Sequence, residues 1–341
     1  MKIAVDAFGG DNAPLSVIDG CAQAMQLNSD IEIVLYGDEE KIKICAQENN
    51  IDISKMEIVH TYEIFDMHDE PKELLKSKKN TSLALAFKAV ANSQADAIVS
   101  AGSTGAILMG ATFIVKRIKG VKRAAIATVL PTTGKPYLLI DSGANINVRP
   151  EALLQFGMLG AAYMQNVMGI KNPTVGLLNN GVEDTKGGDT LVEAYKLLDK
   201  STLNFIGNVE ARDVPSGACD VLVADGFAGN VVLKLTEGLA SSFMSMFKDA
   251  FMANAVSKLS ALALKPQLRK LKKKLDYSEY GGAPFLGARK PVIKAHGSSN
   301  AKAIKSAIMQ ANNFAKSNFT ETVGEFLDQM NAQDNAGEEN V

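Results

Sequence analysis

The segment "DVLVADGFAGNVVLKLTEG", residues 220–238, contains the unit from which the fold is built. It begins with a short apolar run typical of a buried strand and ends with the apolar spacing of a helix. Between them stand Asp225, two glycines and Asn230, residue types that form turns and cap helices. Lys234 follows Asn230 by one helical turn. The segment therefore predicts a strand, a polar turn and a helix in succession.

The same succession recurs along the chain. Further apolar runs predict strands at "KIAV", "IEIVLYG", "DAIVSAG", "AAIATVLP", "PYLLIDSGA", "TVGLLNNG" and "LNFIGN". Helical patterns separate most of them, including "PLSVIDGCAQAMQL", "SLALAFKAVANS", "PEALLQFGMLGAAYMQNVM" and "DTLVEAYKLLD". The apolar runs are nearly continuous, which is typical of strands covered on both faces. We therefore expect an α/β fold with a mostly parallel sheet and helices on both of its faces.

The composition is that of a globular protein, with 46% hydrophobic residues, 22% charged residues and a formal net charge of -2. We expect one large α/β domain, residues 1–330, followed by a disordered tail, residues 331–341. The charge balance predicts no polyanionic partner such as a nucleic acid. Cys21, Cys45 and Cys219 lack CxxC spacing, so neither disulfides nor a zinc site is expected.

The hydropathy pattern predicts neither export nor insertion into a membrane. The N-terminus lacks the apolar region of a signal peptide, so we expect no export. Residues 97–115 are uncharged and approach the length of a membrane span. They contain "SAGSTGA", however, which favours a strand, a glycine loop and a buried helix.

The polar loops indicate where a ligand binds. "DAFGGDNAP", "SAGSTGA", "DSGANINVRP", "LNNGVEDTKGGD", "FIGNVEARD" and "DGFAGN" each follow an expected strand. In an open α/β sheet such loops lie at the carboxyl edge, where ligands bind. Turn chemistry explains any one of them alone. Because all six are expected on one edge, we predict a binding site there.

The side chains of these loops favour a small polyanion such as phosphate. No GxxxxGK[ST], GxGxxG, HExxH or GxSxG motif is present, so common nucleotide sites, a zinc protease and a serine hydrolase are not indicated. The loop "HGSSN" adds a plausible anion seat at a helix start, although a lone His296 is more often structural. Hydroxyls, amides and cations that could contribute are those of Ser103, Thr104, Ser298, Ser299, Asn145, Asn179, Asn180, Asn230, Lys186 and Lys234.

A basic, leucine-containing segment spans residues 250–275 and carries no acid. Its spacing predicts two short amphipathic helices joined at Pro266. A solvated face is one interpretation; an anionic membrane surface or an acidic protein partner is another. The contact residues would be Lys265, Leu268, Arg269, Lys270, Leu271, Lys272, Lys273 and Lys274.

The motifs taken together resemble a known family. "DAFGGDNAP", "SAGSTGAILMGA", "DSGANINVRPEALLQFG", "GLLNNGVEDTKG", "NFIGNVEARD", "DGFAGNVVLKLTEG", "GGAPFLG" and "AHGSSNAKAI" occur in this order over about residues 1–320. This set resembles the bacterial phosphate acyltransferase family of fatty acid and phospholipid synthesis proteins. Phe8 stands where the family usually has Met, and Ser103 where it usually has Asn.

The resemblance implies a Rossmann-like three-layer α/β/α fold, similar to isocitrate dehydrogenase and phosphotransacetylase. It also implies transfer of a fatty acyl group from acyl carrier protein to inorganic phosphate, without a cofactor. A membrane glycerol-3-phosphate acyltransferase would use the resulting acyl phosphate. Further implications are a homodimer and a cytoplasmic location with peripheral association at the inner face of the cell membrane, on an anionic surface.

We assign provisional roles to the matching residues. The phosphate and oxyanion seat would comprise Gly9, Gly10, Ser103, Thr104, Gly297, Ser298 and Ser299, with Asn145, Asn179, Asn180, Asn230 and Gly226 nearby. Lys186 or Lys234 would balance the phosphate charge, and His296 would protonate the leaving thiolate or hold its loop. Asp6, Asp11 and Asp225 would orient lysines and cap helices. Phosphate is itself the nucleophile, so no covalent intermediate is expected.

Two other classes of function compete with this hypothesis. One is another enzyme of the same fold group, either a phosphotransacetylase that uses coenzyme A or a dehydrogenase. The other is a non-catalytic membrane scaffold built around residues 250–275. The polar glycine loops argue against a scaffold, which has no need of them.

Overall fold

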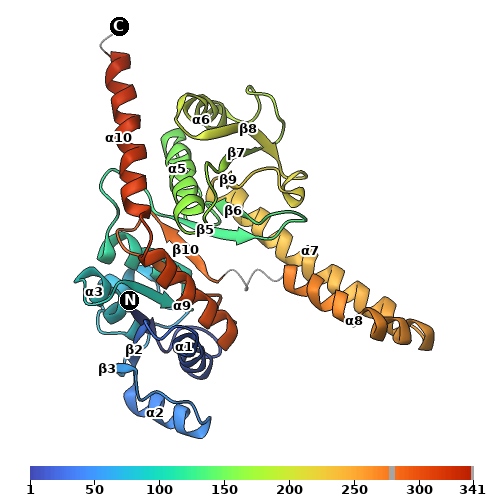
Figure 1. Ribbon diagram of the computed structural model, residues 1–341. Coiled ribbons are helices and arrows are strands. Elements are labelled where there is room, and N and C mark those ends of the chain that lie inside the picture. Colours follow the sequence, from blue (N-terminus) through green and yellow to red (C-terminus); the bar gives the residue numbers. More distant parts are fainter. Residues whose placement is uncertain (276–280, 339–341) are drawn as a thin grey trace.

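The computed structural model describes residues 1–275 and 281–338; within these ranges the side chains of residues 259, 263, 269–275 and 333–338 are not described. Its strands are β1 (Lys2–Asp6), β2 (Glu32–Gly37), β3 (Glu57–His60), β4 (Ala97–Ser100), β5 (Ala125–Leu130), β6 (Tyr137–Ile140), β7 (Thr174–Asn179), β8 (Asn204–Glu210), β9 (Val221–Val223), β10 (Ala283–Leu286) and β11 (Val292–Lys294). Within the described residues these strands form one sheet in the order β3-β2-β1-β4-β11-β10-β5-β6-β9-β7-β8 (Figure 1).

The helices lie between the strands and beyond the last of them. They are α1 (Leu15–Leu27), α2 (Glu39–Glu48), α3 (Ser82–Ala91), α4 (Thr104–Met109), α5 (Pro150–Asn166), α6 (Asp189–Lys200), α7 (Gly226–Met252), α8 (Ala255–Leu275), α9 (Ala301–Ala315) and α10 (Phe319–Glu338). Shorter helical turns are η1 (Pro71–Leu75), η2 (Gly110–Val115), which continues α4 with π-helical geometry, and η3 (Val214–Ser216).

The strands predicted from the apolar runs are all present, and the expected mostly parallel α/β/α arrangement is confirmed. Elements outside these predictions include β3 and α2. β3 is a four-residue edge strand that is only half-buried, and α2 is largely charged, so neither carries a strong apolar signal.

The sheet has two halves whose strands run in opposite directions. β1, β2, β3, β4 and β11 are parallel to one another, and so are β6, β7, β8 and β9. Between the halves, β10 is antiparallel to both β11 and β5, and β5 is antiparallel to β6. The strand direction thus changes at β10 and at the β5–β6 hairpin. Of the six polar loops expected on one edge, those after β4, β6 and β9 line one cavity together with the loop after β11, whereas those after β1, β7 and β8 do not.

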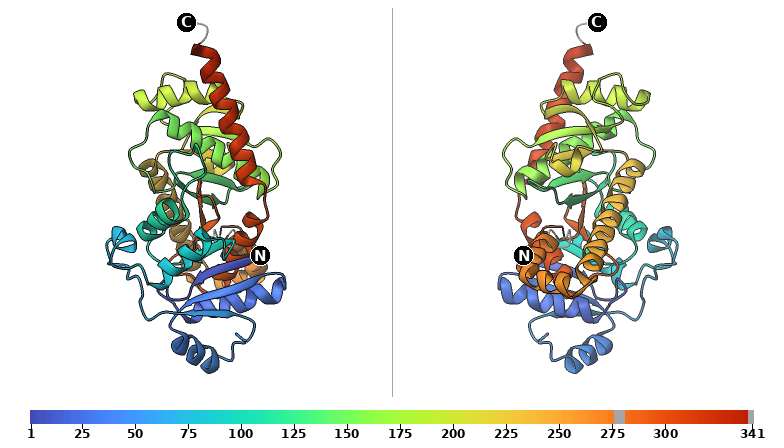
Figure 2. Two further views of the ribbon diagram at one scale, coloured as in Figure 1. Left: turned by 90° about the vertical axis from the view of Figure 1, so that its left-hand side faces the viewer. Right: turned by 90° about the vertical axis from the view of Figure 1, so that its right-hand side faces the viewer.

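The hydrophobic core lies on both faces of the sheet, as the alternation along β1 illustrates. Ile3 and Val5 belong to a cluster that includes side chains of α1, α5 and α9. Ala4, on the opposite face, belongs to a second cluster with Phe87 of α3 and Ile107 of α4. Figure 2 shows these helices covering the sheet from either side. Each large apolar side chain that is fully buried contributes about 1.5–3 kcal/mol to folding.

Helices α7 and α8 form a two-helix arm that projects from the body (Figure 1). Exposed apolar side chains follow one another along α7 at helical spacing: Phe227, Val231, Leu235, Leu239, Phe243, Met246 and Phe247. We refer to these seven residues as the apolar stripe. Most members are four residues apart, so the stripe winds gradually around α7 as it runs along the helix. The arm therefore presents a long apolar face that nothing within the described chain covers.

The turn between the arm helices differs from the prediction. The sequence analysis placed a break at Pro266, but Pro266 lies inside α8 and the chain turns at Ala253 and Asn254. Asn254 caps the N-terminus of α8, because its side chain accepts a hydrogen bond from the backbone N–H of Ser257 at 2.9 Å. Of the predicted contact residues, Lys265 is exposed and Leu268 half-buried. The side chains of Arg269, Lys270, Leu271, Lys272, Lys273 and Lys274 lie outside the described ones.

The C-terminal helix also differs from the prediction. α10 continues to Glu338, whereas a disordered tail was expected from residue 331; residues 339–341 lie outside the described part of the chain. In the regions that the structure describes, none of the helices combines the length and hydropathy needed to cross a bilayer.

Candidate active site

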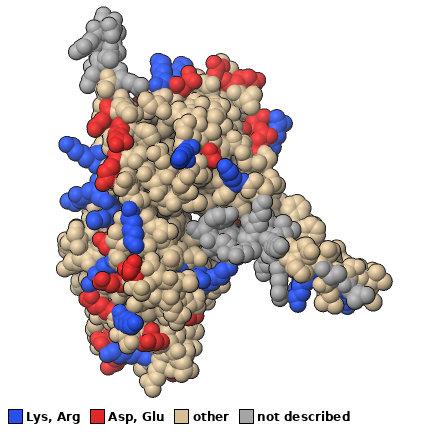
Figure 3. Space-filling view, in the orientation of Figure 1, with Lys and Arg blue, Asp and Glu red and all other residues tan. Residues whose placement is uncertain are grey.

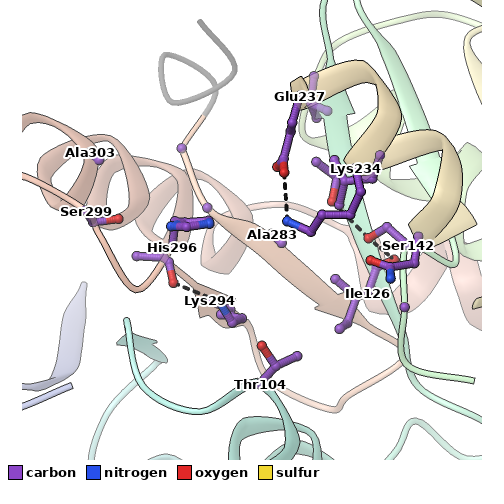
Figure 4. Close-up of a pocket in the computed structure, with 18 residues that line it drawn as sticks. Thr104, Ile126, Ser142, Lys234, Glu237, Ala283, Lys294, His296, Ser299 and Ala303 are labelled. Carbon is purple, nitrogen blue, oxygen red and sulfur yellow. Dashed lines mark hydrogen bonds and ion pairs between the residues drawn. The ribbon is translucent and has the colours of Figure 1, made fainter. Parts of the chain in front are cut away.

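A cavity of about 270 Å³ lies where the two halves of the sheet meet. Strands β5 and β10 form its floor, α7 forms one wall, and the loop before α9 forms another (Figure 4). It is lined by Thr104, Ile126, Thr128, Val129, Ser142, Gly143, Asn230, Leu233, Lys234, Glu237, Gly281, Gly282, Ala283, Lys294, Ala295, His296, Ser299 and Ala303.

The start of α7 brings its side chains to this cavity. Asp225 caps the helix by accepting hydrogen bonds from the backbone N–H groups of Phe227 and Ala228, at 2.8 and 3.0 Å. A Cβ at Gly229 would lie 1.9 Å from the backbone oxygen of Asp141, and one at Gly226 would lie 2.8 Å from the backbone of Asn145. Only glycine permits this close approach. The two glycines thus seat α7 on the loop 141–145, with the next turn at the cavity.

Asp141 organises that loop. Its side chain is fully buried. It accepts hydrogen bonds from the backbone N–H groups of Ile126, Gly143, Ala144 and Asn145 and from Asn145 Nδ2, at 2.7–3.2 Å. Burial raises the pKa of Asp141, and these hydrogen bonds oppose the rise. The loop is consequently fixed, and it holds the residues that follow Asp141 against the cavity.

Two lysines bring positive charge to the cavity from opposite walls. The Lys234 ammonium lies 2.7 Å from the Glu237 carboxylate, one turn along α7. Lys294 ends β11, and its Nζ donates to the backbone oxygen of Ala295 at 3.2 Å. Desolvation lowers the pKa of Lys294 below 10.5, and the charge of Lys234 lowers it further. The two cations therefore affect each other, and an anion between them would relieve that repulsion.

His296 faces the cavity as a neutral ring near pH 7. Burial lowers its pKa below 6.5, and the charge of Lys294 adds to this effect. Its Nδ1 accepts a hydrogen bond from the backbone N–H of Ser298 at 3.2 Å and lies 2.9 Å from Ser298 Oγ. Because Nδ1 is an acceptor, the neutral ring carries its proton on Nε2. The imidazole is thus a hydrogen-bond donor rather than a strong acid.

The arrangement suits the stabilisation of negative charge better than covalent catalysis. Ser142 Oγ donates to the backbone oxygen of Ile126 at 3.1 Å and lies 2.9 Å from Thr128 Oγ1, so its hydroxyl already has partners. Ser298, which touches His296, is not among the lining residues. Among the described side chains, no group of three or more His, Cys, Asp or Glu is placed to hold a metal ion.

Comparison with known proteins identifies the family. The profile of the fatty acid synthesis protein family matches residues 1–322. The chain belongs to that family. A phosphate acyltransferase of Clostridium acetobutylicum is 43% identical over 97% of this chain and 100% of its own length. Another from Geobacillus sp. WCH70 is 47% identical over 96% of this chain and 99% of its own.

Solved structures of proteins with lower sequence identity have the same fold as this chain. A phosphotransacetylase from Streptococcus pyogenes superposes with a TM-score of 0.64 at 17% identity, covering 92% of this chain and 94% of that one. The EutD phosphotransacetylase from Staphylococcus aureus gives 0.62 at 20% identity, with the same coverage. At these identities the similarity establishes the shared α/β/α fold alone.

Five of the residues that the sequence predicted lie together at the cavity of this family member. They come from three separate segments: Thr104, Asn230, Lys234, His296 and Ser299. Figure 4 shows Lys234 and Glu237 facing His296 and Lys294 across the cavity. Ser298 and Gly297 belong to the same loop but act on its shape, the first through His296 and the second through its backbone oxygen, which accepts from Asp11 N at 2.8 Å.

A second predicted group lies beside the cavity rather than at it. Asp6 is buried and accepts hydrogen bonds from Ser82 Oγ at 2.6 Å and Ser100 Oγ at 2.8 Å. Burial raises the pKa of Asp6, and these hydroxyls oppose the rise. A Cβ at Gly9 would meet the Asp6 carboxylate at 2.6 Å. These contacts fix the loop that carries Gly10 and Asp11, while Ser103 precedes α4.

The remaining predicted residues have structural positions. Lys186 is exposed and lies 3.8 Å from Glu183, in the loop after β7. Asn179 and Asn180 belong to that same loop, and none of the three lines the cavity. The reason is the strand order: β9 lies between β6 and β7, so the loops after β6 and β9 line the cavity and the loop after β7 does not. Asn145 binds Asp141 and the backbone, so it supports the loop rather than a ligand.

The sequence analysis missed Lys294, Glu237, Ser142, Thr128 and Asp141. Lys294 offered a signal, because it is a charged residue at the end of an otherwise apolar strand and two positions before His296. Glu237 was hidden because its role depends on the helical spacing to Lys234 and on which face of α7 meets the cavity. Ser142 and Asp141 belong to the loop motif "DSGANINVRP", but no role was predicted for either side chain.

Proposed function

We propose that this chain transfers an acyl group from a thioester to inorganic phosphate. The observation that carries the proposal is the pairing of Lys234 and Lys294 with the neutral His296 around one cavity. Two cations suit a divalent anion, and a neutral imidazole N–H suits the oxygen of a carbonyl that becomes negative. The fatty acid synthesis family and its phosphate acyltransferase relatives support the same reaction.

The reaction balances without a cofactor. Hydrogen phosphate is held between the two ammonium groups and its oxygen attacks the thioester carbonyl carbon. The carbonyl oxygen becomes an oxyanion, and the donors proposed for it are the Nε2–H of His296 and the hydroxyls of Thr104 and Ser299, which all line the cavity. The C–S bond then breaks, and the phosphate proton passes to the thiolate, whose conjugate acid has a pKa of about 8.5. The products are an acyl phosphate and a free thiol.

His296 has a different role in this mechanism from the one first considered for it. A ring whose pKa lies below 6.5 is not protonated at neutral pH and is a weak acid from Nε2. The lowered pKa of the Lys294 ammonium brings it closer to that of a thiol. We assign hydrogen-bond donation to His296 and the relay of the proton toward the leaving sulfur to Lys294.

The donor we propose is a fatty acyl group carried as a thioester on acyl carrier protein. The family description, fatty acid synthesis protein, supports a long acyl chain and a carrier. The acyl phosphate would serve phospholipid synthesis by passing to a membrane glycerol-3-phosphate acyltransferase. Thioesters and acyl phosphates are both activated, so neither ATP nor a redox cofactor is part of the proposal.

The test measures release of free carrier thiol from a long-chain acyl carrier protein, with and without inorganic phosphate. The expected result is release that depends on phosphate, with an equal amount of hydroxylamine-sensitive acyl phosphate. Lys171→Met, at an exposed lysine away from the cavity, is the matched control for Lys234→Met and Lys294→Met. Release that is independent of phosphate would mean that the chain is a thioesterase instead.

A second candidate is a phosphotransacetylase that uses coenzyme A, since solved proteins of that kind share the fold. Fold similarity does not decide the donor. The same assay with acyl-coenzyme A in place of the acyl carrier distinguishes the two. Equal or faster turnover with coenzyme A thioesters would favour this alternative, and binding of vesicles without any turnover would favour a scaffold.

We further propose that the arm mediates a homodimer and peripheral contact with the inner face of the cell membrane. The apolar stripe on α7 supports a second copy of the chain as its partner, because an exposed apolar face of this length is costly in water. The basic run of α8 supports contact with anionic lipid, where each Lys or Arg contributes about 1 kcal/mol.

Two measurements separate these contacts. Phe243→Glu in the apolar stripe is expected to convert a dimer into a monomer in light scattering, and unchanged mass would contradict the dimer. Leu268→Glu with Leu271→Glu is expected to abolish flotation with vesicles that contain anionic lipid. Flotation that persists in the double variant would contradict the membrane contact.

A further inference from the structure

A second hollow, adjoining the cavity, lies on the surface beside α4 and η2. We call it the basic groove. Its volume is about 450 Å³, and it is lined by Leu108, Met109, Thr112, Phe113, Arg117, Lys122, Arg123, Ala124, Ala144 and Asn145. Its floor is apolar and one side is basic. Neither the mechanism proposed above nor the arm uses these residues.

The basic side of the groove is formed by Arg117, Lys122 and Arg123, and the segment that carries them holds charge of one sign. Residues 116–123 contain five Lys or Arg and no acid: Lys116, Arg117, Lys119, Lys122 and Arg123. All five are exposed. An adjoining small hollow adds Arg149 and contains the acid Glu151. Among the ion pairs of the described residues, none involves any of these six basic side chains or Glu151. In Figure 3, basic side chains gather along the left-hand edge of the body, where this segment runs in Figure 1.

The local contacts leave the charges available. The Arg117 guanidinium donates to the backbone oxygen of Lys122, and Arg123 Nη1 lies 3.4 Å from Asn145 Oδ1. These bonds hold the side chains at the rim without neutralising them. Phe113 is 57% exposed and provides an apolar anchor point inside the charged rim. An apolar centre surrounded by unpaired cations is the pattern of a protein-binding surface that selects an acidic partner.

The basic groove is connected to the cavity by two short elements. Helix α4 contributes Thr104 to the cavity and Leu108 to the groove, which are about 6 Å apart along the helix axis. The loop after β6 contributes Ser142 and Gly143 to the cavity, and the next two residues, Ala144 and Asn145, to the groove. A partner seated in the groove is therefore close enough to pass a flexible group into the cavity.

We infer that the basic groove is the docking surface for the acidic protein that carries the acyl thioester. This inference rests on the proposed function and adds the place of docking. An acidic helix of the carrier lies against Arg117, Lys122 and Arg149, and an apolar side chain of that helix contacts Phe113. The thioester arm reaches the cavity past α4. The concave shape and the proximity to the cavity favour a protein partner over a membrane, which needs a projecting surface.

The test compares a carrier-bound donor with a small one. Arg117→Glu combined with Lys122→Glu reverses two charges of the rim. We expect kcat/KM for the acyl carrier to fall about tenfold or more, with a weaker dependence on NaCl concentration. We expect kcat/KM for the same acyl group on pantetheine to stay within about twofold, since that donor lacks the acidic surface. Lys171→Glu, at an exposed lysine elsewhere, is the charge-matched control.

A binding measurement keeps this inference separate from the reaction. Carrier protein without an acyl group is titrated onto wild type and onto the double variant, with chemical shifts of the carrier as the readout. Shifts that disappear in the variant support docking even if wild type shows no phosphate-dependent turnover. An unchanged kcat/KM for the acyl carrier, equal losses with both donors, or carrier shifts that survive in the variant would each overturn it. The inference would also be overturned if the carrier protein did not bind to wild type. The same holds if the double variant lost flotation with vesicles while its use of the acyl carrier was unchanged.

Discussion

Lys234 and Lys294 reach the cavity from α7 and β11, with the rest of the arm between them in the sequence, and the charge of Lys234 lowers the pKa of Lys294. Glu237 opposes this effect and holds Lys234 at 2.7 Å. The cavity thus contains two cations and one anion on its walls, and its capacity for a divalent anion depends on their positions.

Loss of either cation should weaken phosphate use. We expect Lys234→Met and Lys294→Met each to lower kcat/KM for phosphate about 100-fold, because a charged hydrogen bond to the anion is lost in a partly desolvated site. Initial rates over a range of phosphate concentrations measure this. Lys171→Met should match wild type, and a tenfold effect there would point to a general loss of folding.

The ring of His296 should titrate below its ordinary pKa. Nuclear magnetic resonance should show a pKa under 6.5, and Lys294→Met should raise it, because the Lys294 charge lowers it in the wild type. Unfolded chains bind this proton near pH 6.5, so the neutral ring adds stability above that pH, and this stability is lost as the pH falls toward the folded pKa. A pKa that does not move in Lys294→Met would contradict the assigned contact.

Glu237→Gln should shift the same ring in the opposite direction. Glu237 raises the pKa of His296 in the wild type, so its removal should lower that pKa further. The removal also leaves Lys234 without its partner at 2.7 Å. We expect phosphate to bind more tightly while kcat falls, because the freed ammonium is no longer held in place. A higher KM for phosphate together with a higher kcat would argue against this role.

Two glycines of α7 provide a matched pair for stability. Gly229→Ala places a Cβ 1.9 Å from the backbone oxygen of Asp141, so we expect a loss of about 1–3 kcal/mol in the free energy of unfolding. Gly238→Ala, where nothing lies within 4 Å, should instead gain about 0.5–1 kcal/mol from helix propensity. Chemical denaturation measures both. Equal effects of the two substitutions would mean that α7 is not seated on the loop 141–145.

Asp141→Asn should disrupt the same seat from the other side. An amide in place of the carboxylate turns one of its oxygens into a donor that faces the N–H groups of Asn145 or Gly143. We expect about 3 kcal/mol of destabilisation, the cost of leaving buried donors unpaired. Asp52→Asn, at an exposed carboxylate bonded to Ser54, is the control and should change little.

The fold was largely predictable because its signals are local. Apolar runs of strand length and helical spacing between them are properties of consecutive residues, and they located most of the elements. The antiparallel direction of β6 also has a local signal that the prediction of a mostly parallel sheet did not use. Only residues 131–136 join β5 to β6, and they include Pro131, Gly134 and Pro136, whereas a parallel pair needs a crossover of about a dozen residues or more. The order of the strands, in contrast, was not local: β9 lies between β6 and β7, and the loop after β7, which carries Asn179, Asn180 and Lys186, therefore lies outside the cavity.

The site was predictable in part for the same reason. His296 and Lys234 stand beside glycine-rich motifs, whereas Lys294 and Glu237 depend on which face of a strand or helix meets a cavity. The turn of the arm depended on one asparagine, Asn254, rather than on the more conspicuous Pro266. Sequence spacing therefore predicted two features poorly: which side of a helix or strand faces the cavity, and which residue caps a helix.

Helix α7 is held to the body at its N-terminal end, by its contact with the loop 141–145. The helix is 27 residues long, which corresponds to about 40 Å, and its first turn is clamped to the loop 141–145 at Gly226 and Gly229. Lys234 stands close to that clamp, and most of the apolar stripe lies beyond it. The anchored end of α7 thus lies at the cavity, and the far end projects from the body (Figure 1). We therefore expect a contact at the far end of α7 to change the tilt of the helix, and with it the distance between the ammonium groups of Lys234 and Lys294.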